Sequence, residues 1–132
     1  MKKILLLVAA VFLCTAALPA LAADVPTISK EELRAELGTQ EFTILDVRSD
    51  NDWDSSNSKI PGAIRLPIDQ LETWAENFHK STPLVLYCAC EGLGSSGYVA
   101  RMLMEKGFSN VYALNGGWKE WEMSNYPVVP KD

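Results

Sequence analysis

The chain has 132 residues, with 12 basic and 17 acidic side chains and a formal net charge of −5. This length is enough for one compact domain and too short for two. The acidic excess excludes nucleic acid and anionic membrane surfaces as natural partners, because both bind proteins through basic patches.

The first 22 residues have the pattern of a secretory signal peptide. Lys2 and Lys3 precede an apolar stretch over residues 4–18, and the small residues of Ala20-Leu21-Ala22 follow where a signal peptidase cleaves. The apolar run is short of the ~20 residues that a membrane-spanning helix needs, so a retained anchor is the weaker alternative. We expect cleavage after Ala22, an exported and periplasmic protein, and a single domain over residues 23–132 that does not associate with membranes.

The mature sequence alternates helical and strand patterns. Ser29 and Glu32 have the spacing of a capping box and predict a helix that ends at Gly38. The elements expected after it, in chain order, are a strand at 42–47, a polar, turn-rich segment at 49–59, a brief strand at 64–66, a helix at 68–78, a strand at 83–87, a helix at 95–107, a strand at 110–114 and a short helix at 117–123.

Strands that are apolar on both faces and alternate with amphipathic helices predict an α/β fold. Its small parallel β-sheet would be flanked by helices on both faces. In such sheets, binding and catalytic sites form beyond the carboxyl ends of the strands. The segments after Val47 and after Tyr87 occupy that position, so the loop after Tyr87 is the candidate site.

Two cysteines begin this loop. Cys14 leaves with the leader, so Cys88 and Cys90 are the only thiols of the mature chain. A disulfide across one alanine would close almost no loop and stabilise the fold little. Structural zinc needs four ligands, and the one histidine, His79, is on a predicted helix away from the loop; we therefore expect no metal and no cofactor. Either the two cysteines take part in a reaction, or one is a buried residue at the end of the strand and the other has no functional role.

Three motifs in a fixed order carry a family resemblance. They are Asp46-Val47-Arg48 with Ile60-Pro61-Gly62-Ala63, then Tyr87-Cys88 with its loop, and then Gly107-Phe108 with Gly116-Gly117-Trp118. From about Ile28 to Trp121 the sequence resembles a single rhodanese-like domain. The resemblance implies a small parallel α/β fold and the transfer of sulfane sulfur through a cysteine persulfide.

The loop also fits thiolate chemistry on physical grounds. A cysteine attacks as the thiolate, and the backbone N–H groups of a turn closed by a helix start stabilise a thiolate, a persulfide or a bound oxyanion. Glycines permit the tight turn, and a serine could cap the helix. The expected substrate-binding residues are Glu91, Gly92, Leu93, Gly94, Ser95 and Ser96.

Which cysteine is assigned as the nucleophile depends on whether the loop is counted from the strand before it or from the helix after it. The family's cysteine directly follows the strand, which selects Cys88. Counting back from Gly107-Phe108, the usual six-residue loop runs from Cys90 to Ser95, which selects Cys90. We favour Cys90, with Cys88 as the resolving thiol or the reverse.

The charge of the loop departs from the family pattern. Many active members carry arginine or lysine there, whereas this loop has Glu91 and no basic residue; Lys59 is a candidate source of positive charge. A carboxylate repels anionic donors, so a polysulfide or thiol persulfide is a better donor than thiosulfate, with a small or protein thiol as acceptor. Asp46 and Arg48 are expected to form a hydrogen-bonded pair that supports the neighbouring loop.

Sulfane-sulfur transfer is therefore the leading hypothesis for the function. The first alternative is a non-catalytic rhodanese-like binding module, which the absence of a basic residue from the loop favours. The second is a cysteine-dependent, phosphatase-type hydrolase, which an arginine closing the loop would have supported; Ser95 or Ser96 stands there instead.

Overall fold

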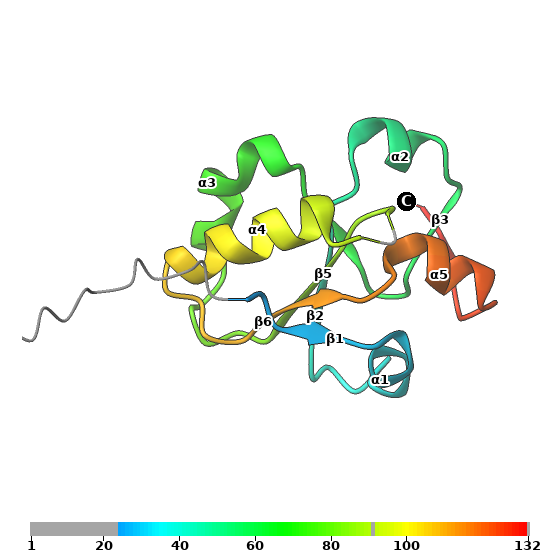
Figure 1. Cartoon of the computed structure of the whole chain (residues 1–132), viewed down its shortest axis with the longest axis horizontal. Coiled ribbons are helices and arrows are strands. Elements are labelled where there is room, and N and C mark those ends of the chain that lie inside the picture. The colour runs from blue at the N-terminus through cyan, green and yellow to red at the C-terminus, as the bar shows by residue number, and fades with distance from the viewer. Residues whose placement is uncertain (1–23, 91, 132) are drawn as a thin grey trace, which may run out of the picture.

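The computed structural model describes residues 24–90 and 92–131, so the predicted leader and Glu91 lie outside the described residues. Its centre is a five-stranded parallel sheet in the order β1-β6-β5-β2-β4 (Figure 1). These strands are β1 (Thr27–Ile28), β2 (Thr43–Asp46), β4 (Ile64–Arg65), β5 (Leu84–Tyr87) and β6 (Val111–Leu114). A separate antiparallel pair joins β3 (Ser58–Lys59) to β7 (Val129–Pro130).

Helices cover both faces of the sheet, as the sequence predicts. Successive residues of β2 and β5 pack into two different hydrophobic cores, one on each face of the sheet. Leu45 and Leu86 belong to the first core, and Ile44 and Val85 belong to the second. The first core also contains residues of α3 (Leu71–Trp74) and α4 (Gly94–Glu105), and the second contains residues of α1 (Lys30–Ala35) and α5 (Gly117–Met123). The predicted α/β class is confirmed.

The register of the central strands places the candidate site. β5 lies between β2 and β6, and its pairing with β2 runs from Thr43 beside Leu84 to Asp46 beside Tyr87. The last residues of both strands are therefore neighbours at the carboxyl edge of the sheet. The loop that begins at Cys88 leaves from this edge.

Two predicted segments differ from the structure. The segment 49–59 contains a helix, α2 (Asp50–Asp54), whose N-terminus is capped by Ser49: its Oγ accepts a hydrogen bond of 3.2 Å from the amide of Asp52. The helix predicted over 68–78 is divided into α3 and two flanking 3-10 turns, Ile68–Gln70 and Ala75–Asn77. Helical spacing is similar in both helix types, so the periodicity did not separate them.

No helix formed by residues 24–90 or 92–131 has the length and apolar character needed to cross a membrane.

Candidate functional site

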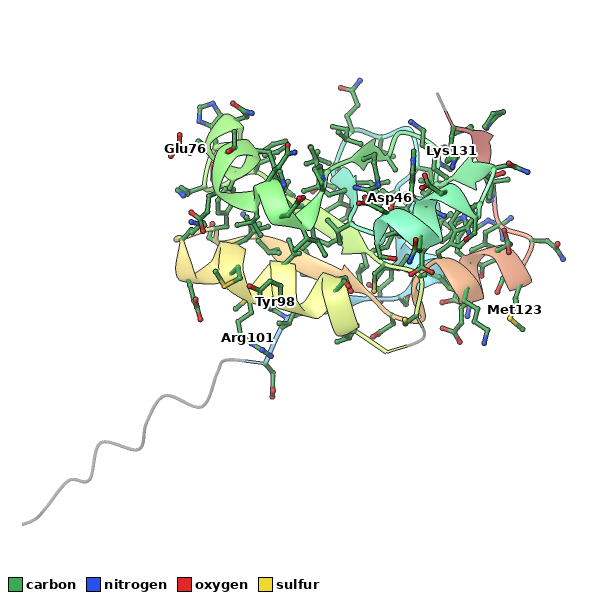
Figure 2. All side chains as sticks on the ribbon, turned by 90° about the horizontal axis from the view of Figure 1, so that it is seen from above. Asp46, Glu76, Tyr98, Arg101, Met123 and Lys131 are labelled. Atoms are coloured by element: carbon green, nitrogen blue, oxygen red, sulfur yellow. The ribbon has the colours of Figure 1, made fainter. Side chains whose placement is uncertain are left out.

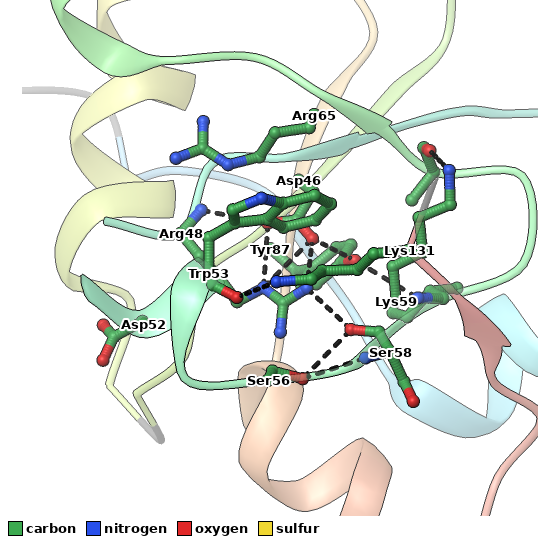
Figure 3. A network of polar contacts seen from close by, with 12 residues as sticks. Asp46, Arg48, Asp52, Trp53, Ser56, Ser58, Lys59, Arg65, Tyr87 and Lys131 are labelled. Carbon is green, nitrogen blue, oxygen red and sulfur yellow. Dashed lines mark hydrogen bonds and ion pairs between the residues drawn. The ribbon is translucent and has the colours of Figure 1, made fainter. Parts of the chain in front are cut away.

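A buried ion pair lies beneath the loop. Nη2 of Arg48 is 2.7 Å from Oδ2 of Asp46, and its Nε is 3.0 Å from each carboxylate oxygen. The hydroxyl of Tyr87 donates a 2.6 Å hydrogen bond to the same carboxylate and accepts one from the amide of Ile60 (Figure 3). Burial raises the pKa of Tyr87, and the neighbouring Asp46 charge raises it further. The phenol therefore stays protonated and fixes the end of β5.

The guanidinium of Arg48 connects this pair to the neighbouring segment. Its Nη2 also donates a 2.9 Å hydrogen bond to the carbonyl of Ser58. Its central carbon lies 4.5 Å from the ring centre of Trp118, 5.1 Å from that of Trp53 and 5.6 Å from that of Tyr87. Arg48 is thus enclosed by aromatic faces, which stabilise a cation. Its Nη1 is buried and has no hydrogen-bond partner among residues 24–90 and 92–131.

The structure places the two candidate thiols in different surroundings. Cys88 directly follows β5 and is 3% exposed, and its Sγ is 3.5 Å from the hydroxyl oxygen of Ser96. That hydroxyl donates to the carbonyl of Leu93, at 3.2 Å. Cys90 is exposed, and both thiols are free. Cys88 therefore faces the interior of the loop, while Cys90 is accessible to solvent.

The first turn of α5 holds the loop from the other side. The amide of Trp118 donates a 2.8 Å hydrogen bond to the carbonyl of Cys88, and the amide of Lys119 donates to that of Ala89, at 3.3 Å. Gly117 has a φ of +58°, and a Cβ there would lie 2.5 Å from the carbonyl oxygens of both Cys88 and Cys90. Only glycine allows this close approach.

The remaining loop residues lie at the start of α4. This helix begins at Gly94, one residue before the predicted start, and its N-cap is Leu93. Ser95 and Ser96 are inside the helix, so the expectation that either one caps it is wrong. The suggestion that Lys59 supplies charge to the thiol loop is not supported, because its ammonium donates a 3.0 Å hydrogen bond to the carbonyl of Ala63. Glu91 is outside the described residues.

A polar cavity of about 420 Å³ adjoins the loop. Its lining comes from the segment around α2, from the loop and from α5: Asp52, Ser55, Ser56, Asn57, Ser58, Ala89, Trp118 and Glu122. No motif in the sequence marks these residues as functional, and the polar character of residues 49–59 indicates only an exposed segment there. Within the described parts of the chain, no three His, Cys, Asp or Glu side chains are grouped as metal ligands would be.

Comparison with known proteins relates the whole domain to one family. The sequence profile of the rhodanese-like domain matches residues 29–124. The chain is 33% identical over 95 residues to the uncharacterized protein YqhL of Bacillus subtilis, covering 72% of this chain and 71% of that protein. It is 32% identical over 83 residues to the thiosulfate sulfurtransferase GlpE of Coxiella burnetii, covering 63% of this chain and 74% of that protein.

The fold agrees with this relationship. The solution structure of the rhodanese-like domain of the Alr3790 protein from Anabaena superposes with a TM-score of 0.69 at 27% identity, covering 80% of each chain. The match in sequence spans most of the described residues, and the parallel sheet places the two cysteines at the carboxyl end of its central strand. The chain therefore belongs to the rhodanese-like domain family.

Proposed function

We propose that this protein transfers sulfane sulfur through a persulfide on Cys90. The thiolate of Cys90 attacks the outer sulfur of a donor R–S–SH, so that Cys90 carries –S–SH and R–S⁻ leaves. An acceptor thiolate R′–S⁻ then attacks the outer sulfur of the persulfide, which releases R′–S–SH and restores the Cys90 thiolate. The supporting observation is an exposed, free thiol at the end of the central strand of a rhodanese-like domain.

The different exposure of the two thiols supports this assignment. A donor can reach the sulfur of Cys90 without rearrangement of the loop, whereas Cys88 is enclosed by the loop and packs against Ser96. The loop residues Gly92 and Ser96 contact the thiol of Cys88, since its Sγ is 4.0 Å from the carbonyl oxygen of Gly92 and 3.5 Å from the hydroxyl oxygen of Ser96.

The charges around the loop support a polysulfide or thiol-persulfide donor over thiosulfate. The described loop residues include no cation, and the adjoining cavity is lined by Asp52 and Glu122. Carboxylates repel the oxyanion group of thiosulfate, whereas the reacting sulfur of a polysulfide or of a thiol persulfide need not be part of an oxyanion. The relationship to GlpE, a thiosulfate sulfurtransferase, supports sulfur transfer at the level of the family.

The cellular location belongs to the same proposal. The leader pattern over residues 1–22 supports export to the periplasm, where sulfane-sulfur donors would be small molecules or protein thiols. Cleavage after Ala22 would be measured as the N-terminal sequence of the protein recovered from a periplasmic extract.

Intact mass spectrometry tests the transfer reaction. The reduced domain, residues 23–132, is treated with polysulfide and separately with thiosulfate, as the wild type and as the Cys88→Ser and Cys90→Ser variants. We expect polysulfide to add about 32 Da in the wild type and in Cys88→Ser, with loss of the adduct on reduction. Cys90→Ser should form none.

Three other outcomes would replace the proposal. An adduct that disappears only in Cys88→Ser would make Cys88 the nucleophile. The absence of any adduct, with both thiols free and the fold intact, would favour a non-catalytic binding module, a function with which the buried position of Cys88 also agrees. Hydrolysis of an aryl phosphate would instead indicate a phosphatase-type enzyme.

A further inference from the structure

We propose that a second cavity, at the carboxyl edge of the sheet, binds a small organic carboxylate and that Arg65 anchors it. The cavity, called the Arg65 pocket below, has a volume of about 330 Å³. Its lining includes two arginines, two carboxylates and an apolar pair: Arg48, Arg65, Asp50, Asp69, Pro67 and Ile68. Such a site goes beyond sulfur transfer, because it involves neither cysteine.

The Arg65 pocket lies on the edge of the sheet where an α/β fold binds ligands. Asp46, the last residue of β2, pairs with Tyr87 of β5 on one side and with Arg65 of β4 on the other. Neighbouring strands are about 4.8 Å apart, so the backbone of Arg65 is roughly 10 Å from that of Tyr87. The pocket is therefore on the same edge as the loop of the two cysteines, two strands away from it.

Arg65 has a hydrogen-bond donor that nothing uses. Its Nη2 donates a 3.0 Å hydrogen bond to Oδ1 of Asp50, whereas its Nε is buried and has no partner within the part of the chain that the structure describes. In the complete arrangement, Nε and Nη2 of Arg48 both donate to the carboxylate of Asp46. A buried N–H without an acceptor is uncommon in folded proteins. The Nε and Nη2 edge of Arg65 is therefore half-occupied, and the two oxygens of a carboxylate would complete it.

Asp50 is a weak competitor for this edge. Its side chain is 90% exposed, and an ion pair with an exposed carboxylate contributes little. The side chain of Arg65 is only 17% exposed, and its guanidinium carbon lies 5.4 Å from the ring centre of Trp53 (Figure 3). A ligand carboxylate can therefore replace Asp50, which turns into solvent, while the guanidinium of Arg65 stays in place.

The rest of the lining indicates the class of ligand. Arg48 also lines the pocket, but Asp46 compensates its charge, so Arg65 is the anchor. Pro67 and Ile68, which follow β4, give the pocket an apolar wall. A short aliphatic carboxylate would place its oxygens at Arg65 and its methyl groups against this wall. The volume of the pocket is at the lower end of the range for small-molecule sites.

An NMR titration at constant ionic strength tests this assignment with three probes. Isovalerate has a carboxylate and a branched chain, isovaleramide has nearly the same shape without the charge, and acetate has the charge without the chain. Each is added to the 15N-labelled domain, and the Nε–H signal of Arg65 and the amide signal of Ile68 are followed. We expect saturable shifts with isovalerate, none with isovaleramide, and a Kd for acetate at least about fivefold higher than for isovalerate.

Removing the internal competitor should strengthen binding. Asp50→Asn should lower the Kd of isovalerate by about two- to fivefold, because Arg65 loses the carboxylate that occupies half of its edge. Asp54→Asn is the matched control, since it removes the same charge from an exposed position of the same helix that does not line the pocket. This control should leave the Kd nearly unchanged. Equal decreases in the two variants would reveal a general charge effect and overturn the assignment.

Changing the anchor should weaken binding. Arg65→Lys keeps the charge but cannot bind a carboxylate through two parallel hydrogen bonds, so the Kd of isovalerate should rise by about fivefold or more. Arg101→Lys, at an exposed position of α4, should keep the wild-type Kd. Equal binding of isovaleramide, or a wild-type Kd in Arg65→Lys, would overturn the inference. Neither result bears on persulfide formation at Cys90, which the mass measurements test separately.

Discussion

Tyr87 links the end of the central strand to the buried ion pair, and its surroundings make it sensitive to alkaline pH. It shares the carboxylate of Asp46 with Arg48, and all three side chains are buried. Ionising the phenol would place a second negative charge beside Asp46 in a region without solvent. The residue that directly precedes Cys88 is therefore held in one protonation state.

This arrangement predicts a specific pH dependence of stability. The pKa of Tyr87 is higher in the folded chain than its ordinary value of 10.0. The protonated phenol of Tyr87 therefore contributes fully to the free energy of unfolding below about pH 10. This contribution is lost as the pH rises above that value, by up to about 1.4 kcal/mol per pH unit. Urea unfolding between pH 8.5 and 11 should show this loss in the wild type.

Tyr87→Phe is the control for that measurement. The variant should be less stable at neutral pH by about 1–3 kcal/mol, because Asp46 and the amide of Ile60 lose a buried partner. Its free energy of unfolding should then decline less than that of the wild type above pH 10. Parallel curves for the two proteins would show that the Tyr87 phenol is not the responsible group.

Gly117 determines how closely α5 approaches the loop. Gly117→Ala should lower the free energy of unfolding by about 2–4 kcal/mol, because its Cβ would collide with two backbone carbonyls of the loop. Gly38→Ala is the matched control: its φ is also positive, at +80°, but nothing lies within 4 Å of the added Cβ. Gly38→Ala should lower the free energy of unfolding by about 1 kcal/mol. Equal losses in urea unfolding would contradict a role for close packing at Gly117.

At the level of elements, the sequence was informative where a pattern is local. The long apolar runs that became β2, β5 and β6 were predictable from residue order, as was the helix cap at Ser29, whose Oγ accepts from the amide of Glu32. β1 was not predicted, because its two residues have no periodicity and are defined by pairing with β6 far along the chain. The antiparallel pairing of β7 with β3 is likewise a contact between distant segments.

Only part of the candidate site could be predicted from the sequence. Its cysteines, its loop and the Asp46 and Arg48 pair follow from motifs that are contiguous in sequence. The cavity does not, since Asp52 and Glu122 approach the same space only after α2 and α5 have packed around the loop. The aromatic enclosure of Arg48 also depends on Trp53 and Trp118, which are far apart in the chain.

The cap of α2 provides a test at this scale. Ser49→Ala should destabilise the protein by about 1 kcal/mol and should accelerate amide exchange at Asp52 and Trp53, because the amide of Asp52 loses its hydrogen bond to the Ser49 side chain. Ser29→Ala removes the equivalent cap of α1 and should have a similar cost without affecting those amides. Unchanged exchange in Ser49→Ala would show that packing, not the cap, maintains α2.

For the whole molecule, the negative charge of the chain should influence which donors react rapidly. The net charge of −5 repels anions over the distance that salt leaves unscreened (Figure 2 draws all side chains of the described residues). Raising the ionic strength from 0.01 to 0.15 M should therefore accelerate persulfide formation by a polysulfide dianion and leave that by an uncharged alkyl persulfide nearly unchanged. A polysulfide rate that falls with salt would reveal local attraction instead.

The pairing of β7 with β3 has a practical consequence for work on this protein. β7 adds a strand to the segment that forms one wall of the cavity, and the C-terminus lies near α2 and α5 in Figure 1. A purification tag or fluorescent reporter joined after Asp132 would begin one residue beyond Lys131, close to the loop, and would obstruct large acceptors. A reporter at that position would equally be well placed to sense their arrival, whereas a tag for kinetic work belongs at the start of the mature domain.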